Sequence, residues 1–120
     1  MRSVGAQWEN AALAHLLRAG LKPLDRNFSC RYGEIDIVAR DHETVVFVEV
    51  RFRNDAAHGD GTASVGAAKR EKLARTAQIW LQARPQLADA PCRFDVIGCS
   101  GTAQNARIEW VRGAFEVAEG

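Results

Sequence analysis

The sequence lacks the features that would predict a disulfide framework, a zinc site or a membrane span. Its three cysteines, Cys30, Cys92 and Cys99, include no CxxC pair and are odd in number, which favours a reducing compartment. The three histidines lie too far apart along the chain to predict a histidine metal cluster. Because there is no run of about 18 apolar residues, we expect a soluble, cytoplasmic protein with no membrane partner.

Several enzyme signatures are also missing. The chain has no Walker loop, no GxGxxG and no Gly-x-Ser-x-Gly motif, so nucleotide hydrolysis, dinucleotide redox chemistry and serine hydrolysis lack support. The formal net charge is only +1, so any surface for nucleic acid must come from local clustering of basic residues. The 120 residues contain no linker and no repeat, and we expect residues 1–120 to form a single domain.

The stretch Gly33–Arg53 is predicted to form a β-hairpin that carries acidic residues in otherwise apolar strands. Strict alternation would place Ile35, Ile37 and Ala39 on one face of the first arm, and Glu34, Asp36 and Val38 on the other. The second arm would place Val46, Val48, Val50 and Phe52 on one face, and Val45, Phe47, Glu49 and Arg51 on the other. The hairpin is therefore the first place to look for chemistry.

The expected register of this hairpin brings two carboxylates together. A symmetric turn with a two-residue tip after Asp41 pairs Asp36 with Glu49, and Glu34 with Arg51. Two charges about 5 Å apart repel by on the order of 3 kcal/mol at an effective dielectric of about 20. A divalent cation would turn this repulsion into coordination, and carboxylate oxygens suit Mg²⁺ or Mn²⁺.

These residues carry a resemblance to a known superfamily. Asp36 followed by Glu49-Val50-Arg51 on the next strand resembles the Asp…Glu-x-Lys signature of the PD-(D/E)xK nucleases, and the arrangement is most similar to archaeal Holliday junction resolvases. Nearly the whole chain resembles the bacterial YraN-like family. The matching residues are Glu9, Gly33-Glu34-Ile35-Asp36, Val46-Phe47-Val48-Glu49-Val50-Arg51, Lys69, Lys72-Leu73 and Arg93-Phe94-Asp95-Val96.

The resemblance implies an α/β fold with the three-layer core of restriction endonucleases. A mixed sheet of about five strands would have one helix before the central hairpin and a second helix after it. The implied metal ligands are Glu9, Asp36, Glu49 and the carbonyl of Val50, holding Mg²⁺ or Mn²⁺. A homodimer is the assembly that resolvase-like folds often adopt.

The signature departs from the superfamily at Arg51, which stands where the nucleases usually place lysine. Arginine stays protonated at accessible pH, so it can hold a phosphate but cannot act as a general base. Water activation would then depend on the metal. Asp36, Glu49, Arg51 and Lys69 are therefore the candidate catalytic residues.

Helices are predicted on both sides of the hairpin. The first spans Gly5–Ala19 and ends at Gly20 as C-cap, with Glu9 either a first-turn acid favoured by the helix dipole or a third carboxylate near the metal. The second spans Ser64–Arg84, with Ser64 as N-cap and Lys69 on its core-facing stripe. Lys69 either extends its charged end into solvent or points at the acidic pair, where it would replace the lysine missing at Arg51.

The remaining segments complete the expected sheet. Strands are predicted at Leu21–Ser29, Arg93–Cys99 and Arg107–Val111, whereas Asn54–Ala63 reads as a polar loop that is either a substrate flap or plain surface. Asp95 is open to a structural role or a supporting role at the site.

Three functions remain open from the sequence. The first is a metal-dependent nuclease acting on DNA, with Arg51, Arg53, Lys69, Lys72 and Arg75 contacting phosphates. The second is a non-catalytic module of the same fold that binds nucleic acid or another protein. The third is purely structural, with Glu34 paired to Arg51 and a protonated Asp36 hydrogen-bonded to Glu49.

Overall fold

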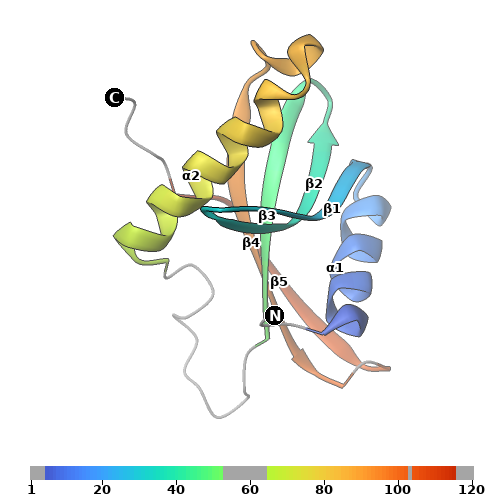
Figure 1. Cartoon of the computed structure of the whole chain (residues 1–120). Helices are drawn as coiled ribbons and strands as arrows, with labels where there is room; N and C mark the ends of the chain where they lie inside the picture. The colour runs from blue at the N-terminus through green and yellow to red at the C-terminus, as the bar shows by residue number, and fades with distance from the viewer. Residues whose placement is uncertain (1–4, 53–64, 103, 116–120) are drawn as a thin grey trace.

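The computed structural model describes residues 5–52, 65–102 and 104–115, and it shows the expected α/β architecture. The elements in chain order are α1 (Ala6–Arg18), β1 (Lys22–Cys30), β2 (Gly33–Asp41), β3 (Thr44–Phe52), α2 (Ala67–Gln82), the 3-10 turn η1 (Pro85–Leu87), β4 (Cys92–Gly101) and β5 (Ala106–Phe115). The strands form one five-stranded sheet in the order β1-β2-β3-β4-β5. Only the β3–β4 pair of this sheet is parallel, and α2 lies in the crossover between these strands (Figure 1).

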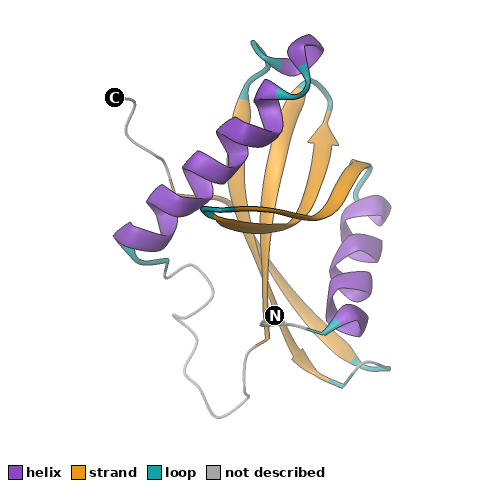
Figure 2. Ribbon diagram, viewed as in Figure 1, coloured by secondary structure: helices purple, strands orange, loops and turns teal. Residues whose placement is uncertain are grey.

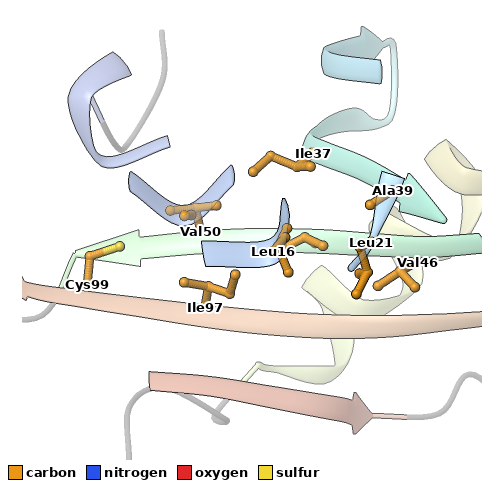
Figure 3. Close-up of a cluster of buried hydrophobic side chains, with 10 residues drawn as sticks. Leu16, Leu21, Ile37, Ala39, Val46, Val50, Ile97 and Cys99 are labelled. Atoms are coloured by element: carbon orange, nitrogen blue, oxygen red, sulfur yellow. The ribbon is translucent and has the colours of Figure 1, made fainter. Parts of the chain in front are cut away.

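The two helices cover opposite faces of the sheet, which gives three layers (Figure 2). On one face, Ala12 and Leu16 of α1 pack against apolar side chains of β2, β3 and β4. Figure 3 shows this cluster, in which Leu16, Leu21, Ile37, Ala39, Val46, Val50, Ile97 and Cys99 are labelled. On the other face, Leu73, Ala77 and Trp80 of α2 pack against Val45 and Phe47.

The boundaries of several elements differ from the sequence-based expectation. Helix α1 ends at Arg18 with Ala19 as C-cap, in place of the predicted Gly20. Gly66 caps α2 in place of the predicted Ser64, and the helix ends at Gln82. Strand β5 is longer than predicted, because it runs to Phe115 and pairs with β4 along most of its length. Ser64 and the loop Asn54–Ala63 lie outside the described residues.

The hairpin of β2 and β3 has the expected symmetric turn, with Asp41 opposite Thr44, and its ladder extends to the pair Ile37 and Val48. His42 in the tip adopts a positive φ of 55°, as tight two-residue turns require. The ladder between β2 and β3 ends at Ile37, so the predicted ladder pairs Asp36–Glu49 and Glu34–Arg51 do not form. Glu34 pairs with Ser29 of β1.

The ribbon formed by β1 and β2 exchanges its faces near Asp36. Ile37 packs in the α1-side cluster, whereas Ile35, two residues earlier, packs in the α2-side cluster. The partner strand does the same, because Phe28 joins the α2-side cluster and Arg26 reaches Glu9 of α1. Between these two positions Asn27 has a left-handed φ of 58°.

This exchange corrects the predicted alternation of the first arm, in which Ile35 shared a face with Ile37. Residues two apart share a face only in a regular strand, and the left-handed Asn27 interrupts the regular ladder beside Asp36. Asp36 therefore lies at the transition between the two faces. No helix in the described part of the chain combines the length and apolar character needed to cross a membrane.

Candidate active site

Asp36 lies where β2 separates from β3. Its carboxylate accepts a hydrogen bond from a backbone N–H of β3, as a backbone carbonyl would in a regular ladder. Its Oδ2 atom accepts a hydrogen bond from the backbone N–H of Val50 at 2.7 Å. Asp36 lies one residue before Ile37, and Val50 two residues after Val48, which form the last pair of the β2–β3 ladder. The side chain is buried, since Asp36 is only 8% exposed. A carboxylate is thus fixed beside the central strand of the core.

The surroundings of Asp36 oppose its ionisation. The pKa of Asp36 is raised from 3.8 to about 7, chiefly because the side chain is buried. The hydrogen bond from Val50 lowers the pKa, and the nearby carboxylates of Glu49, Glu9 and Glu34 raise it. Three further acidic side chains therefore disfavour the ionised form of Asp36. Such an arrangement is costly for stability and is typical of functional sites.

Glu49 of β3 points to the α2 face and meets Lys69. The Nζ atom of Lys69 lies 2.7 Å from Oε2 of Glu49, whose side chain is 8% exposed, whereas that of Lys69 is 49% exposed. Lys69 stands one turn before Leu73 on the buried stripe of α2, so its position on the helix directs it over the sheet. Of the two alternatives drawn from the sequence, the structure shows the one in which Lys69 points at the acidic pair.

Glu9 approaches the same region from α1. It is 1% exposed, and its Oε1 atom lies 3.5 Å from a guanidinium nitrogen of Arg26 in β1. A first-turn acid that served only the helix dipole would lie in solvent. Glu9 is instead buried, and its carboxylate contributes to the raised pKa of Asp36. We refer to Asp36 and the three acids that raise its pKa, Glu9, Glu34 and Glu49, as the acidic cluster.

The carboxylates can be tested for their fit to a divalent cation. Within the described ranges, no three Asp, Glu, His or Cys side chains converge closely enough to form a ready metal site. Mg²⁺, however, is often held by only one or two carboxylates together with water and substrate oxygens. Asp36 and Glu49 are the candidates for such a pair, with hard oxygen ligands of the kind that Mg²⁺ prefers. Direct ligation by Glu9 and by the carbonyl of Val50 stays a prediction.

Arg51 lies near the end of β3. Arg51 is partly buried and is aligned with Gly98 of β4, two residues beyond Glu49. Its predicted ladder partner Glu34 belongs to the part of β2 that pairs with β1. Arg53 lies outside the described residues.

Asp95 is a structural residue of the sheet. Its carboxylate accepts hydrogen bonds from Trp110 Nε1 at 2.9 Å, from the backbone N–H of Gly113 at 2.9 Å and from Arg93 Nε at 3.0 Å. Arg93 also donates to Asp41 at 2.9 Å. Asp95 therefore joins β4 to β5 and is fully occupied by these donors.

The structure adds two groups that the sequence-based reasoning missed. Arg26 compensates the buried Glu9, but a lone arginine within a strand gives no signal for this role. Tyr32, in the turn between β1 and β2, lies beside α2 with the Cζ atom of Arg75 5.5 Å from its ring centroid. An aromatic residue next to arginine in a polar turn was the available signal for Tyr32.

Comparison with known proteins gives a consistent assignment. The family described as "Uncharacterised protein family UPF0102" matches residues 8–99. A UPF0102 protein of Stutzerimonas stutzeri is 47% identical over 115 residues, which cover 96% of each chain. One from Xanthomonas campestris pv. campestris is 49% identical over 113 residues, which cover 94% of this chain and 91% of the relative. One from Pseudomonas paraeruginosa is 44% identical over 117 residues, covering 96% and 94% respectively. These names state no activity.

Proposed function

The chain belongs to the uncharacterised protein family UPF0102, in agreement with the resemblance to YraN-like proteins, and we propose that it is a metal-dependent endonuclease acting on DNA. The observation that carries this proposal is the buried pair Asp36 and Glu49, held on neighbouring strands with Lys69 2.7 Å from Glu49. The substrate proposed is branched or junction DNA, as the resemblance to resolvases implies.

The energetic cost of the acidic cluster supports a catalytic role. The pKa of Asp36 is raised to about 7 by its burial and by neighbouring carboxylates. A sheet under selection for stability alone would place apolar residues at these positions. Binding of a cation gives a reason for keeping these carboxylates, because the cation would compensate their buried negative charge.

Each residue can be given a role in phosphodiester hydrolysis. Asp36 and Glu49 would hold Mg²⁺ or Mn²⁺, and the chemistry supplied by the ion would be activation of a water molecule and stabilisation of the developing negative charge. Lys69, with its ammonium at Glu49, is placed to neutralise a phosphate oxygen as the missing signature lysine would. Arg51 is assigned to holding the phosphate, since its guanidinium cannot serve as a base.

The DNA strand is proposed to follow α2. Lys69, Lys72 and Arg75 recur every three residues and are exposed, so they form a basic row on one side of the helix. Such a row contacts successive phosphates and gives binding that weakens with added salt. Arg51 and Arg53 are the further phosphate contacts proposed from the sequence.

A cleavage assay with matched variants tests the proposal. Branched or flapped DNA should be cut in Mn²⁺ and remain intact in EDTA. Glu49→Gln should abolish cutting while largely sparing binding, whereas Glu43→Gln, in the exposed hairpin turn, should behave as wild type. Lys69→Ala should impair both properties, and cutting more severely.

Two results would count against the nuclease. Salt-sensitive binding without cleavage of any junction, flap or single strand, in Mg²⁺ or Mn²⁺, would favour the alternative of a non-catalytic nucleic-acid-binding module. Loss of binding as well would leave the acidic cluster with a structural role only.

A further inference from the structure

We propose that Tyr32 is a stacking platform for an unpaired base of the DNA strand, with Arg31, Lys72 and Arg75 as its phosphate contacts. This inference rests on the proposed function, because it specifies which part of a DNA substrate the protein holds beside the acidic site. The platform consists of these four residues, from the β1–β2 turn and from α2.

Two guanidinium groups lie near the aromatic ring of Tyr32. Arg31 donates to the Tyr32 hydroxyl at 2.9 Å, and its Cζ atom lies 4.9 Å from the ring centroid. Arg75 approaches the same ring from α2, with its Cζ atom 5.5 Å from the centroid. Tyr32 remains partly exposed and Arg31 and Arg75 are exposed, so the group is open to a ligand.

The turn that carries Tyr32 is fixed against α2. The Cys30 thiol lies 3.7 Å from Oγ1 of the buried Thr76, which itself donates to the carbonyl of Lys72 at 2.8 Å. Gly33 has a φ of 151°, and a Cβ atom there would lie 3.7 Å from the same hydroxyl. Figure 1 shows this tip of the ribbon beside the middle of α2. A platform held in this way loses little conformational entropy when it binds a ligand.

The charge of the platform fits a polyanion. Arg31, Lys72 and Arg75 are cationic, and the acid beside them, Glu71, lies 3.3 Å from Arg75 in an exposed ion pair. Charged arginines and an aromatic ring together are the usual means of binding single strands, in which each base has a free face for stacking. A base inside a duplex has no such face.

The distance from the acidic site sets which nucleotide would be bound. Lys69 at Glu49 and Arg75 at Tyr32 are six residues apart on α2, which is about 9 Å at about 1.5 Å per residue. At the duplex spacing of about 3.4 Å per nucleotide, this distance corresponds to at most about three nucleotides, and to fewer if the strand is extended. The unpaired base would therefore lie a few nucleotides from the phosphate at Asp36 and Glu49, as it does beside a flap or a branch point.

Oligonucleotide binding in EDTA tests the platform without any need for cleavage. The probe is a single-stranded oligothymidine that contains one 2-aminopurine, whose fluorescence falls when the base stacks on an aromatic ring. Wild type should quench the probe, Tyr32→Phe should retain the quenching, and Tyr32→Leu should lose it and bind about tenfold more weakly. Phe52→Leu, at another exposed aromatic residue, should match wild type.

The arginine provides a second, independent readout. Arg75→Gln, at an exposed position, should lower the salt dependence of single-strand binding, log K against log salt concentration, by about 0.7. Arg40→Gln, an exposed arginine on the same ribbon, should leave this slope unchanged. This measurement remains available if Tyr32→Leu does not fold.

The outcomes separate the platform from the nuclease. Quenching that depends on Tyr32 in a protein that cuts no DNA would support the platform and refute the nuclease. Cleavage by wild type with equal single-strand binding by wild type and Tyr32→Leu would refute the platform alone. Absence of quenching by wild type, or an equal loss of duplex and single-strand affinity in Tyr32→Leu, would also overturn it.

Discussion

The backbone N–H of Val50 donates to Oδ2 of Asp36 at 2.7 Å, immediately after the ladder between β2 and β3 has ended. A side-chain oxygen thus satisfies a donor that a backbone carbonyl would otherwise satisfy. The hydrogen bond holds the carboxylate in place, but it does not cancel the cost of burying it, because the pKa of Asp36 is still raised to about 7.

Wild type is expected to lose stability as the pH rises, and Asp36→Asn should remove this loss. Asp36 has a pKa of about 7 in the folded protein against 3.8 for the free side chain, so the folded state binds more protons between these values. The free energy of unfolding of wild type should therefore fall as the pH rises through this window, by on the order of 3 kcal/mol between pH 5 and pH 8. Urea unfolding at pH 5 and pH 8 in EDTA measures the difference.

The matched control for this experiment is Asp89→Asn, an exposed acid outside the site. It should keep the slope of wild type, while Asp36→Asn should be the more stable protein at pH 8. Identical pH slopes in wild type and Asp36→Asn would show that Asp36 is not the group responsible.

Mn²⁺ binding should depend on pH because the ion must displace a proton from Asp36. Below its pKa of about 7 the carboxyl is protonated, so the affinity should fall by about tenfold for each pH unit and become constant above that value. Calorimetry at pH 6, 7 and 8 measures this trend, and Asp36→Asn should bind far more weakly at pH 8. A flat affinity profile, or equal affinity in the variant, would dispose of the metal site.

Removing Lys69 should destabilise the protein without metal, since Glu49 would then be left as a buried charge. In EDTA, Lys69→Met is expected to lower the free energy of unfolding by about 1–2 kcal/mol. This value is below that of a fully buried ion pair because the lysine is half-exposed and solvent screens its charge. Saturating Mn²⁺ should recover most of this loss by compensating Glu49. Lys22→Met, at an exposed lysine of β1, should show neither effect, and an equal cost with and without Mn²⁺ would contradict the arrangement.

Asp95→Ala should destabilise the protein strongly, because Trp110, Gly113 and Arg93 would lose their shared acceptor. The expected cost is about 3–5 kcal/mol for a buried, hydrogen-bonded charge, and Asp95→Asn should cost less. Mn²⁺ affinity should be unchanged at a temperature at which Asp95→Asn is still folded. A selective loss of Mn²⁺ affinity in that variant would instead assign Asp95 to the site.

The sequence predicted the parts of the fold that depend on local patterns. The turn at Asp41 and Thr44, the five strands and both helices follow from alternation, turn chemistry and helical periodicity. The sequence also placed Lys69 on the core-facing stripe of its helix, where its charged end could reach either solvent or a buried acid. The contact with Glu49 was seen only in the structure.

The remainder depended on interactions that local patterns do not encode. The departure of Ile35 from the α1-side cluster comes from the left-handed Asn27 on the neighbouring strand, which no periodicity in β2 reveals. Likewise, the pairing of Glu34 with Ser29 depends on how β1 draws the start of β2 away from β3. The grouping of Tyr32 with Arg75 required the docking of the turn on α2.

The exchange of faces in the β1–β2 ribbon also divides the site between two levels of local stability. Residues of β2 from Ile37 to Arg40 are paired with both β1 and β3, whereas Glu34 and Ile35 are paired with β1 only. Hydrogen exchange should therefore be faster at Glu34 and Ile35 than at Val38 and Ala39. A local opening that detached the ribbon tip from α2 would take Asp36 away from Val50 and leave Glu49 in place. A DNA strand bridging Tyr32 and Lys69 would slow that opening, so the substrate would itself hold the two halves of the site together.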